Sequence, residues 1–226
     1  MLSAYLGWRS LGGAEKDAWI RTFAIAYAAM GGTSFYNADF TGADFTGAIL
    51  KSTDLRAKTL DRVSWHNAKK LDLARVGNAI LAQPAVRQLL IEGNGHNKIY
   101  ANADLNGANL NGATLSQANL KGANLDRATL QKANLEWANL SEVQALRADF
   151  TGACFTGACL ESWNIDASTI LDNVDCQYIF LLEQPNAQGS RERHPHDPDK
   201  IFSTRRLRET LPQNHEYRTG FAPRRR

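Results

Sequence analysis

The sequence predicts an all-β solenoid, in which the backbone winds around one axis and each turn stacks on the turn before it. Three observations lead to this prediction. A repeat of five residues runs in one frame from residue 101 to Ile170. Thirteen of the 14 central positions from Leu105 to Ile170 are Leu, Ile or Phe. Two positions before these centres, Ala occurs in eleven of the 14 repeats.

A period of five residues fits neither a regular helix nor a flat strand. A helix would scatter such positions around its axis, and a strand would place them on alternating faces. The backbone must therefore turn once per repeat. In the repeat Ala103-Asp104-Leu105-Asn106-Gly107, the Ala and Leu would point inward, the Asp outward, and the last two residues would form a corner.

The same frame occurs earlier in the chain, so we predict two blocks of repeats, 33–65 and 101–172. The apolar centres, and the small residues before them, should form the core because stacked coils enclose a dry interior. The predicted core residues are Phe35, Phe40, Phe45, Leu105, Leu110, Leu115, Leu120, Ala123, Leu125, Leu130, Leu135, Leu140, Phe150, Phe155 and Leu160.

This pattern resembles that of the pentapeptide-repeat family, whose motif is a small residue, Asn or Asp, Leu or Phe, and two variable residues. The resemblance implies a right-handed quadrilateral β-helix. Three stretches are similar to those of cyanobacterial pentapeptide-repeat proteins in particular. They are Gly-Gly-Thr-Ser-Phe at 31–35, Leu-Asp-Leu-Ala-Arg at 71–75, and the run from Gly-Ala-Cys to Asp-Cys-Gln-Tyr between 157 and 178.

Residues 66–100 interrupt the repeat, and their apolar spacing is typical of helices. Apolar residues recur from Leu71 to Leu81 and again after Pro84. A proline suits the first turn of a helix, and the glycine at position 93 suits a helix end. We therefore predict a helical hairpin inserted over 66–100.

The N-terminal residues 1–32 are predicted to form a helical cap. Trp19, Phe23 and Tyr27 recur at four-residue intervals, which is typical of one face of a helix. Such a helix would cover the unpaired edge of the first coil. An alternative interpretation is a helix that lies in a membrane interface and makes the protein a peripheral membrane-associated module.

The C-terminal part is predicted to contain a closing strand over 173–184 and a basic, flexible tail over 185–226. Residues 200–226 hold eight Lys or Arg against Glu209 and Glu216, which gives this segment a net charge of +6. Segments rich in charge and poor in apolar residues seldom fold alone. We expect the tail to attract acidic surfaces in a salt-sensitive way.

The composition predicts a soluble, cytoplasmic protein. The whole chain has a net charge of +3, which is too small to indicate nucleic acid as a partner. Residues 1–30 lack a basic start followed by an unbroken apolar run, so we expect no signal peptide, and no stretch predicts a transmembrane helix. Three cysteines, an odd number, fit a reducing compartment.

No constellation of residues predicts an enzyme, a cofactor, a metal site or a small-molecule substrate. The predicted interior holds no ionisable residue between 101 and 157, whereas catalysis needs converging polar groups. Cys154 and Cys159 occupy outward positions of successive repeats, so they should face different sides and share no zinc ion. His194 and His196 flank a proline, but no further ligand accompanies them in the sequence.

The function predicted from these features is a non-catalytic scaffold that mediates protein–protein interaction. The partner would be an unknown protein, and specificity would come from the inserted hairpin. Candidate binding residues are Arg75, Arg87, Arg205, Arg206 and Arg208. Another alternative is an acidic DNA mimic that regulates an enzyme such as gyrase. Residues 101–172 carry eight acids and four bases, a weak excess beside the charge density of a duplex.

Overall fold

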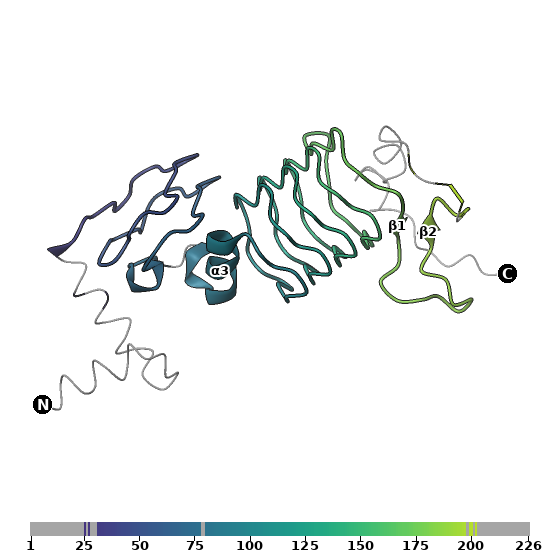
Figure 1. Cartoon of the computed structure of the whole chain (residues 1–226), viewed down its shortest axis with the longest axis horizontal. Helices are drawn as coiled ribbons and strands as arrows, with labels where there is room; N and C mark the ends of the chain where they lie inside the picture. Colours follow the sequence, from purple (N-terminus) through teal and green to yellow (C-terminus); the bar gives the residue numbers. More distant parts are fainter. Residues whose placement is uncertain are drawn as a thin grey trace, which may run out of the picture. The chain divides into compact units, whose positions relative to one another are not determined.

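The computed structural model describes residues 25, 27, 31–77, 80–197, 199–200 and 202. It consists of two compact units, 1–84 and 85–226, which are described separately. The regular elements are η3 (Leu71–Leu73), η4 (Ile80–Ala82), α3 (Pro84–Glu92), β1 (Ile179–Phe180) and β2 (Arg193–His194) (Figure 1). Most of the remaining described chain forms coils that are held together by single parallel bridges.

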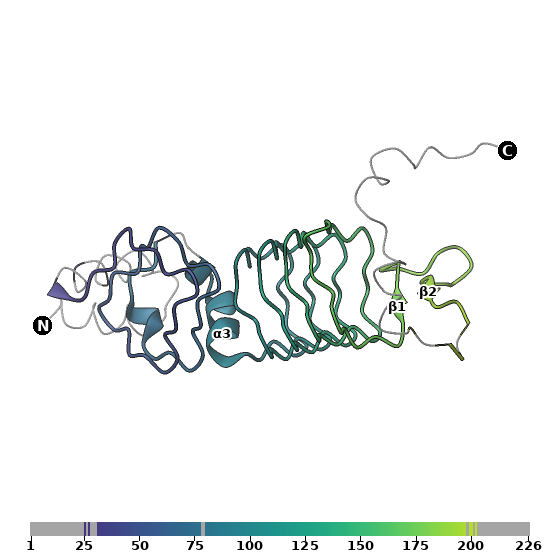
Figure 2. The same cartoon turned by 90° about the horizontal axis from the view of Figure 1, so that it is seen from above.

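Of the 19 bridges among the described residues, 15 join residues 20 positions apart and four join residues 21 apart, so one coil contains four repeats of five residues, in places with one additional residue. Ser34 pairs with Asp54 in the first unit, and Asn94 pairs with Thr114 in the second. Within each unit the coils lie one behind another (Figure 2). Each outward residue therefore has a neighbour one coil away, about 4.8 Å distant.

The corners explain why Asn and Asp are frequent at the outward position. The side-chain oxygen of Asp104 accepts a hydrogen bond of 3.1 Å from the backbone N–H of Asn106, and Asn139 accepts one of 3.0 Å from Ser141. These contacts fix the backbone where it turns. The last residue of a repeat commonly has a left-handed backbone, with a φ of 59° at Gln117.

The interior of the second unit consists of stacked aliphatic and aromatic side chains. All predicted core residues from Leu105 to Leu160 are buried, and so is the small Ala123. Phe150, Phe155 and Trp163 pack together, with ring centroids 5.4–5.7 Å apart.

In the first unit, Phe35, Phe40 and Phe45 are only half-buried. Their rings meet edge to face, and the Phe45 ring stacks on Trp65 at 5.0 Å. The three phenylalanines lie in the first coil of the described repeats, and Trp65 lies in the next coil.

The predicted helical hairpin over 66–100 is wrong, because its first arm belongs to the coils of the first unit. Lys69 pairs with Ile49 and Arg75 pairs with Asp54, with only the short η3 between them. The apolar spacing around Leu71 comes from a coil side with an extra turn, and a helix was predicted because both arrangements bury residues three apart.

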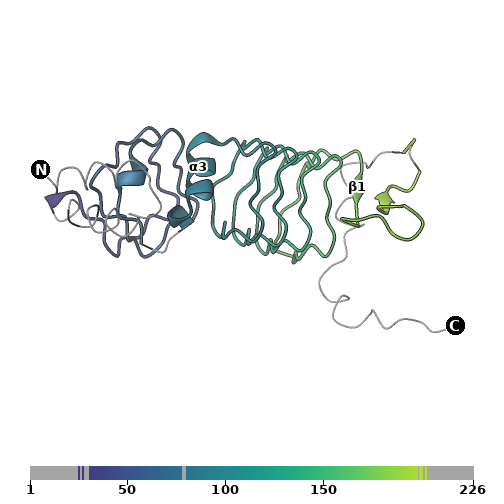
Figure 3. The same cartoon turned by 90° about the horizontal axis from the view of Figure 1, so that it is seen from below.

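The second arm is a true helix, α3, which begins at Pro84 and buries Val86, Leu89 and Leu90. The backbone N–H of Gly93, which has a φ of 66°, bonds to the carbonyl of Leu89 at 2.8 Å and ends the helix. Figure 3 shows α3 beside the first coil of the second unit, which begins immediately afterwards.

One additional residue shifts the repeat frame late in the second unit. Gln144 pairs with Asn164, 20 positions on, whereas Asp149 pairs with Ile170, 21 positions on. Ile170 therefore occupies an outward position, and the predicted centre at that residue is wrong. The hydroxyl of Thr169 takes the place of the usual Ala and donates a hydrogen bond of 2.8 Å to the carbonyl of Ala145.

The predicted closing strand over 173–184 is instead the end of the last coil followed by a short hairpin. Asp175 pairs with Cys154, and β1 then pairs antiparallel with β2. The predicted flexible tail over 185–226 therefore begins too early: residues 193–194 belong to the hairpin. The Phe202 N–H also bonds to the carbonyl of Gln177 at 3.0 Å.

The predicted N-terminal cap over 1–32 lies outside the described residues, apart from residues 25, 27, 31 and 32. Both Ile25 and Tyr27 are helical. Across the residues that the structure describes, the helices are too short or too polar to cross a membrane.

Candidate interaction surfaces

The outward residues of the second unit form columns, in which each residue is bridged to the equivalent residue of the next coil. Members of one column lie 20 positions apart in the sequence, or 21 after the additional residue. One column contains Ile99, Asn119, Asn139, Cys159 and Phe180. The columns are mainly polar and uncharged, so features with a distinctive chemistry must come from corners and from the segment after the last coil.

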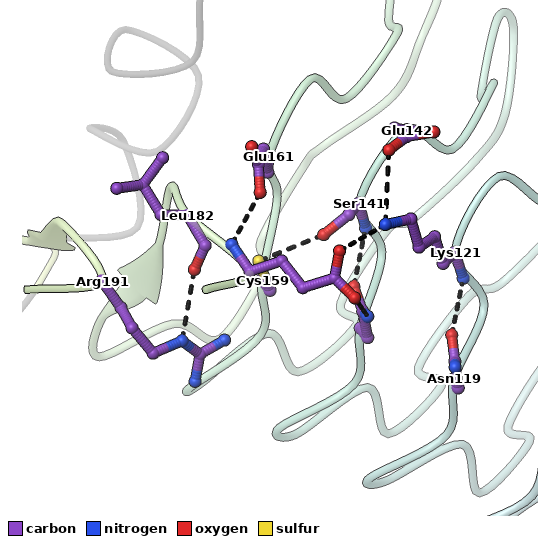
Figure 4. Close-up of polar contacts among 10 residues, drawn as sticks. Asn119, Lys121, Ser141, Glu142, Cys159, Glu161, Leu182 and Arg191 are labelled. Atoms are coloured by element: carbon purple, nitrogen blue, oxygen red, sulfur yellow. Dashed lines mark hydrogen bonds and ion pairs between the residues drawn. The ribbon is translucent and has the colours of Figure 1, made fainter. Parts of the chain in front are cut away.

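Residues 181–192, here called the closing loop, leave the last coil and lie against this column (Figure 4). Glu183 is the central contact. Its carboxylate accepts hydrogen bonds from Lys121 Nζ at 2.5 Å and from Asn139 Nδ2 at 2.9 Å. Its backbone N–H donates to Glu161 Oε2 at 2.7 Å, and Glu142 lies 3.5 Å from Lys121 Nζ.

The ion pair shifts the titration of both partners in the directions expected for opposite charges. The hydrogen bond with Glu183 raises the pKa of Lys121, and the hydrogen bond from Lys121 lowers the pKa of Glu183. Both groups therefore stay charged at neutral pH. The pair fixes the closing loop on the coils.

The cysteines show no sign of an activated nucleophile. Cys159 occupies an outward position but is buried, and its sulfur lies 3.3 Å from Ser141 Oγ. Cys176 points into the core, where burial raises the pKa of its thiol to about 12. Burial also raises the pKa of Cys154. A reactive cysteine needs the opposite shift, because the thiolate is the nucleophile.

A cluster of aromatic rings and arginines occupies one corner of the second unit. Trp137 lies 5.8 Å from the Tyr178 ring and 6.2 Å from the Phe180 ring, centroid to centroid. The guanidinium of Arg191 lies 4.3 Å over Phe180, and that of Arg193 lies 4.5 Å over Tyr178. These five residues are called the aromatic corner below.

The backbone of the coils holds Trp137 in place. Its φ of 59° is left-handed, which is unusual for a bulky residue. One coil further on, Gly157 leaves the space that the indole occupies: a Cβ there would lie 2.7 Å from Trp137 Cδ2. Despite this contact, 52% of the Trp137 surface remains exposed. The ring is thus both positioned and accessible.

Two histidines follow the arginines of this corner. The rings of His194 and His196 lie 4.1 Å apart. Burial, and secondarily the neighbouring His196, lower the pKa of His194. In the described part of the chain, no three His, Cys, Asp or Glu side chains converge as metal ligands.

The two predicted binding residues that the structure describes, Arg75 and Arg87, belong to different units. Arg75 lies in the first unit, where its guanidinium is 3.8 Å from Asp54. Arg87 belongs to α3 and is half-buried. Residues 205, 206 and 208 lie outside the described residues. These assignments stay predictions.

The sequence reasoning missed the aromatic corner, although the repeat contains its signal. Once one coil is known to hold four repeats, Trp137 and Gly157 become neighbours in one column. In such a column, a bulky aromatic residue one coil before a glycine indicates that its ring packs against the glycine backbone. The contributions of Arg191 and Arg193 could not be inferred, because they depend on the path of the closing loop.

A family model for pentapeptide repeats matches residues 26–56, 103–141 and 130–162, with eight copies of the repeat. A search of curated proteins gave no match.

Several solved structures are similar to the chain. A pentapeptide repeat protein from Nostoc PCC 7120 is 28% identical, with a TM-score of 0.31; the match covers 37% of this chain and 68% of that protein. A pentapeptide repeat protein from the Arabidopsis thaliana thylakoid lumen is 26% identical, with a TM-score of 0.30, covering 54% of this chain and 65% of that protein. HetL, a pentapeptide repeat protein involved in heterocyst differentiation regulation in Nostoc, is 25% identical, with a TM-score of 0.20, covering 70% of this chain and 67% of HetL.

The family match falls on the stretches where parallel bridges from one coil to the next stack the repeats. The sequence pattern and the backbone pairing therefore agree that these stretches are pentapeptide repeats.

Proposed function

We propose that this protein is a non-catalytic scaffold that binds another protein through the aromatic corner of its second unit. The observation that carries the proposal is the exposed Trp137 ring, held beside Tyr178, Phe180 and two arginines. Trp, Tyr and Arg are the residues that most often dominate the free energy of protein–protein binding. Their grouping on a single corner favours a specific binding surface.

The proposal is supported by the way these side chains are held before any partner arrives. Gly157 supports one side of the indole, and the Arg191 Nε donates a hydrogen bond of 3.2 Å to the carbonyl of Leu182. Arg193 donates a hydrogen bond of 3.0 Å to the carbonyl of Asp197. A surface that is ordered in advance loses less conformational entropy on binding.

We further propose that the coils have the right-handed, four-sided form that the family resemblance implies. Bridges between residues 20 positions apart support four sides per coil. A stack of this kind would give the corner a stiff base, and repeat proteins use such extended surfaces to bind partners.

Mimicry of DNA is the weaker proposal, because none of the bridged outward columns in the described part of the second unit contains more than one acid. The column of Asn109, Thr129, Asp149 and Ile170 contains one acid in four residues. Duplex DNA carries one negative charge per about 1.7 Å. We expect no inhibition of gyrase supercoiling by the purified protein at micromolar concentration; clear inhibition would restore this alternative.

The proposal can be tested by photo-crosslinking from the corner. A photoreactive amino acid at position 137 should capture a defined partner from an extract of the source organism, with crosslinks that map to one surface of that partner. The matched control is position 36, because Tyr36 is 65% exposed and carries Arg56 4.8 Å over its ring, in the first unit.

A second arm uses substitutions. Trp137→Ala should abolish binding of the captured partner, whereas Tyr36→Ala should preserve it. Equal crosslinking from both positions, or unchanged binding by Trp137→Ala, would refute the aromatic corner as the binding surface.

A further inference from the structure

The first unit carries a charged cluster formed by Tyr36, Asp54, Arg56 and Arg75, which is called the arginine cluster below. Asp54 is bridged to Ser34 in the coil before it and to Arg75 in the coil after it. Tyr36 and Arg56 follow Ser34 and Asp54 by two residues, so they occupy the same corner in successive coils. The stacking of the coils therefore brings these four side chains together.

The side chain of Arg56 is held by three contacts. Its Nε donates a hydrogen bond of 2.9 Å to Asp54 Oδ1, and its Nη2 donates one of 2.7 Å to Oδ2. The guanidinium also lies 4.8 Å over the Tyr36 ring. A Cβ added at Gly77 would lie 3.2 Å from Arg56 Cγ, so the glycine backbone packs against the arginine stem. A side chain ordered in this way loses little conformational entropy when a ligand binds.

Arg75 places a second guanidinium beside the same carboxylate. Its Nη1 lies 3.8 Å from Asp54 Oδ2, which gives attraction without a hydrogen bond. Among the described residues, none accepts a hydrogen bond from the Arg75 guanidinium. Arg56 uses its Nε and Nη2 on Asp54, so the N–H groups of its Nη1 face no described acceptor either. Both arginines therefore keep donors for a ligand.

The charges of the arginine cluster do not balance. Two guanidinium groups share one carboxylate, which leaves a net charge of +1. The hydrogen bonds from Arg56 lower the pKa of Asp54, so this carboxylate stays ionised at neutral pH. The side chains of Arg56 and Arg75 are only 34% and 35% exposed. Partly buried charges are screened less by salt than exposed ones, so the cluster should attract an anion.

The positions of the donors favour a tetrahedral anion. Arg56 Nη2 and Arg75 Nη1 both lie within 3.8 Å of one oxygen of Asp54, so a single small anion can reach both groups. A phosphate monoester offers three oxygens that point in different directions and carries a charge of about −1.5 to −2 at pH 7. A carboxylate offers two coplanar oxygens and a single charge. Phosphate is also a group that arginine binds particularly well.

We propose that the arginine cluster binds a phosphate monoester, with Arg56 and Arg75 donating hydrogen bonds to its oxygens. Asp54 is a positioning residue that holds Arg56, and Tyr36 supports the same guanidinium with its ring. A small phosphate ester and a phosphorylated side chain of another protein present the same group to the cluster. The proposal goes beyond the scaffold function, because the aromatic corner takes no part in it.

The test is a titration of the isotopically labelled full chain with phenyl phosphate, followed through the Nε–H resonances of the arginines. Arg56→Gln and Arg75→Gln assign the two resonances of the cluster. Both resonances should shift until saturation and give one common dissociation constant. Phthalate, a dicarboxylate, should bind about tenfold more weakly, because it loses about one charged hydrogen bond. Equal affinity for the two anions would overturn the assignment to phosphate.

Substitutions separate this site from a diffuse charge effect. Arg75→Gln should weaken phenyl phosphate binding about tenfold, as read from the Arg56 resonance, and Arg75→Lys should weaken it less. The matched control is Arg62→Gln, which removes the same charge from another corner of the first unit and should leave the affinity unchanged. The remaining arginine resonances report whether the fold is intact. Equal losses from Arg75→Gln and Arg62→Gln, or cluster resonances that do not move, would overturn the proposal.

A second titration identifies the source of the phosphate. Its probe is a heptapeptide with one phosphoserine between glycines. Affinity equal to that of phenyl phosphate supports a site for small phosphate esters, and tighter binding supports a site for a phosphorylated protein segment. Equal binding of the unphosphorylated heptapeptide would overturn both. No partner of the aromatic corner is present in these measurements, so their failure would leave the proposed function standing.

Discussion

Replacing Gly157 with Ala directly tests the packing of the Trp137 ring against Gly157. A left-handed backbone costs a residue with a Cβ about 1–2 kcal/mol. At Gly157, with a φ of 75°, the new Cβ would also lie 2.7 Å from Trp137 Cδ2, and such overpacking adds about 1–3 kcal/mol. We expect Gly157→Ala to lower the free energy of unfolding by about 2–5 kcal/mol.

Gly112→Ala is the matched control, because Gly112 has a φ of 67° and a Cβ added there would meet no atom within 4 Å. It should cost only the backbone contribution, about 1–2 kcal/mol. Urea unfolding followed by circular dichroism gives both values. In a Trp137→Ala background the excess cost of Gly157→Ala should vanish, since the clashing ring is absent. Equal costs for the two glycines, or an excess that persists without the ring, would refute the reasoning.

Three further predictions concern the core, the closing loop and the hairpin. Ala123→Leu should cost about 1–3 kcal/mol in urea unfolding, because its side chain is fully buried; Asn124→Ala, which points outward, should cost less than half as much, and equal costs would mean that the assigned register is wrong. Lys121→Met should speed alkylation of Cys159 by iodoacetamide, because the ion pair that holds the closing loop over this thiol is lost; an unchanged rate would show that other contacts hold the loop. The pKa of His194 is lower in the folded protein than in the unfolded chain. As the pH falls, the unfolded chain therefore takes up the proton first. The hairpin should be most stable above about pH 6.5 and should lose stability as the pH falls towards the pKa of the folded state. Amide exchange in β1 and β2, corrected for its intrinsic pH dependence, should therefore accelerate between about pH 7 and pH 5, and a His194→Gln variant should lack this change.

The repeat and its frame could be predicted because they follow from local chemistry. The alternation of Ala, a polar residue and Leu within each five residues leaves few backbone paths that bury the apolar side chains. The side chains of the outward Asn and Asp then accept hydrogen bonds from backbone N–H groups in the corners, as Asp104 does from Asn106. Every step of this reasoning uses residues that are close in the sequence.

Features that depend on distant contacts were predicted poorly. Leu71 suits a helix as well as a coil side, and only the pairing of Lys69 with Ile49 and of Arg75 with Asp54 separates the two. The aromatic corner also depends on contacts between separate coils and on the course of the closing loop.

The late frame shift was missed for a different reason. Ile170 and Leu171 are adjacent and equally apolar, so the sequence does not indicate which of them points inward. The turn at Asp166 determines which of the two points inward. The Asp166 side chain accepts a hydrogen bond of 2.9 Å from the N–H of Ser168. This turn lengthens the corner by one residue.

That longer corner shows where the chain can gain or lose residues. In a flat strand, one extra residue would turn every later side chain to the opposite face. Here Asp175 still pairs with Cys154, because the corner absorbs the addition before the next side begins. A foreign peptide inserted between Asp166 and Thr169 should therefore be displayed without loss of the later coils, which makes corners of this kind natural points for grafting new sequences.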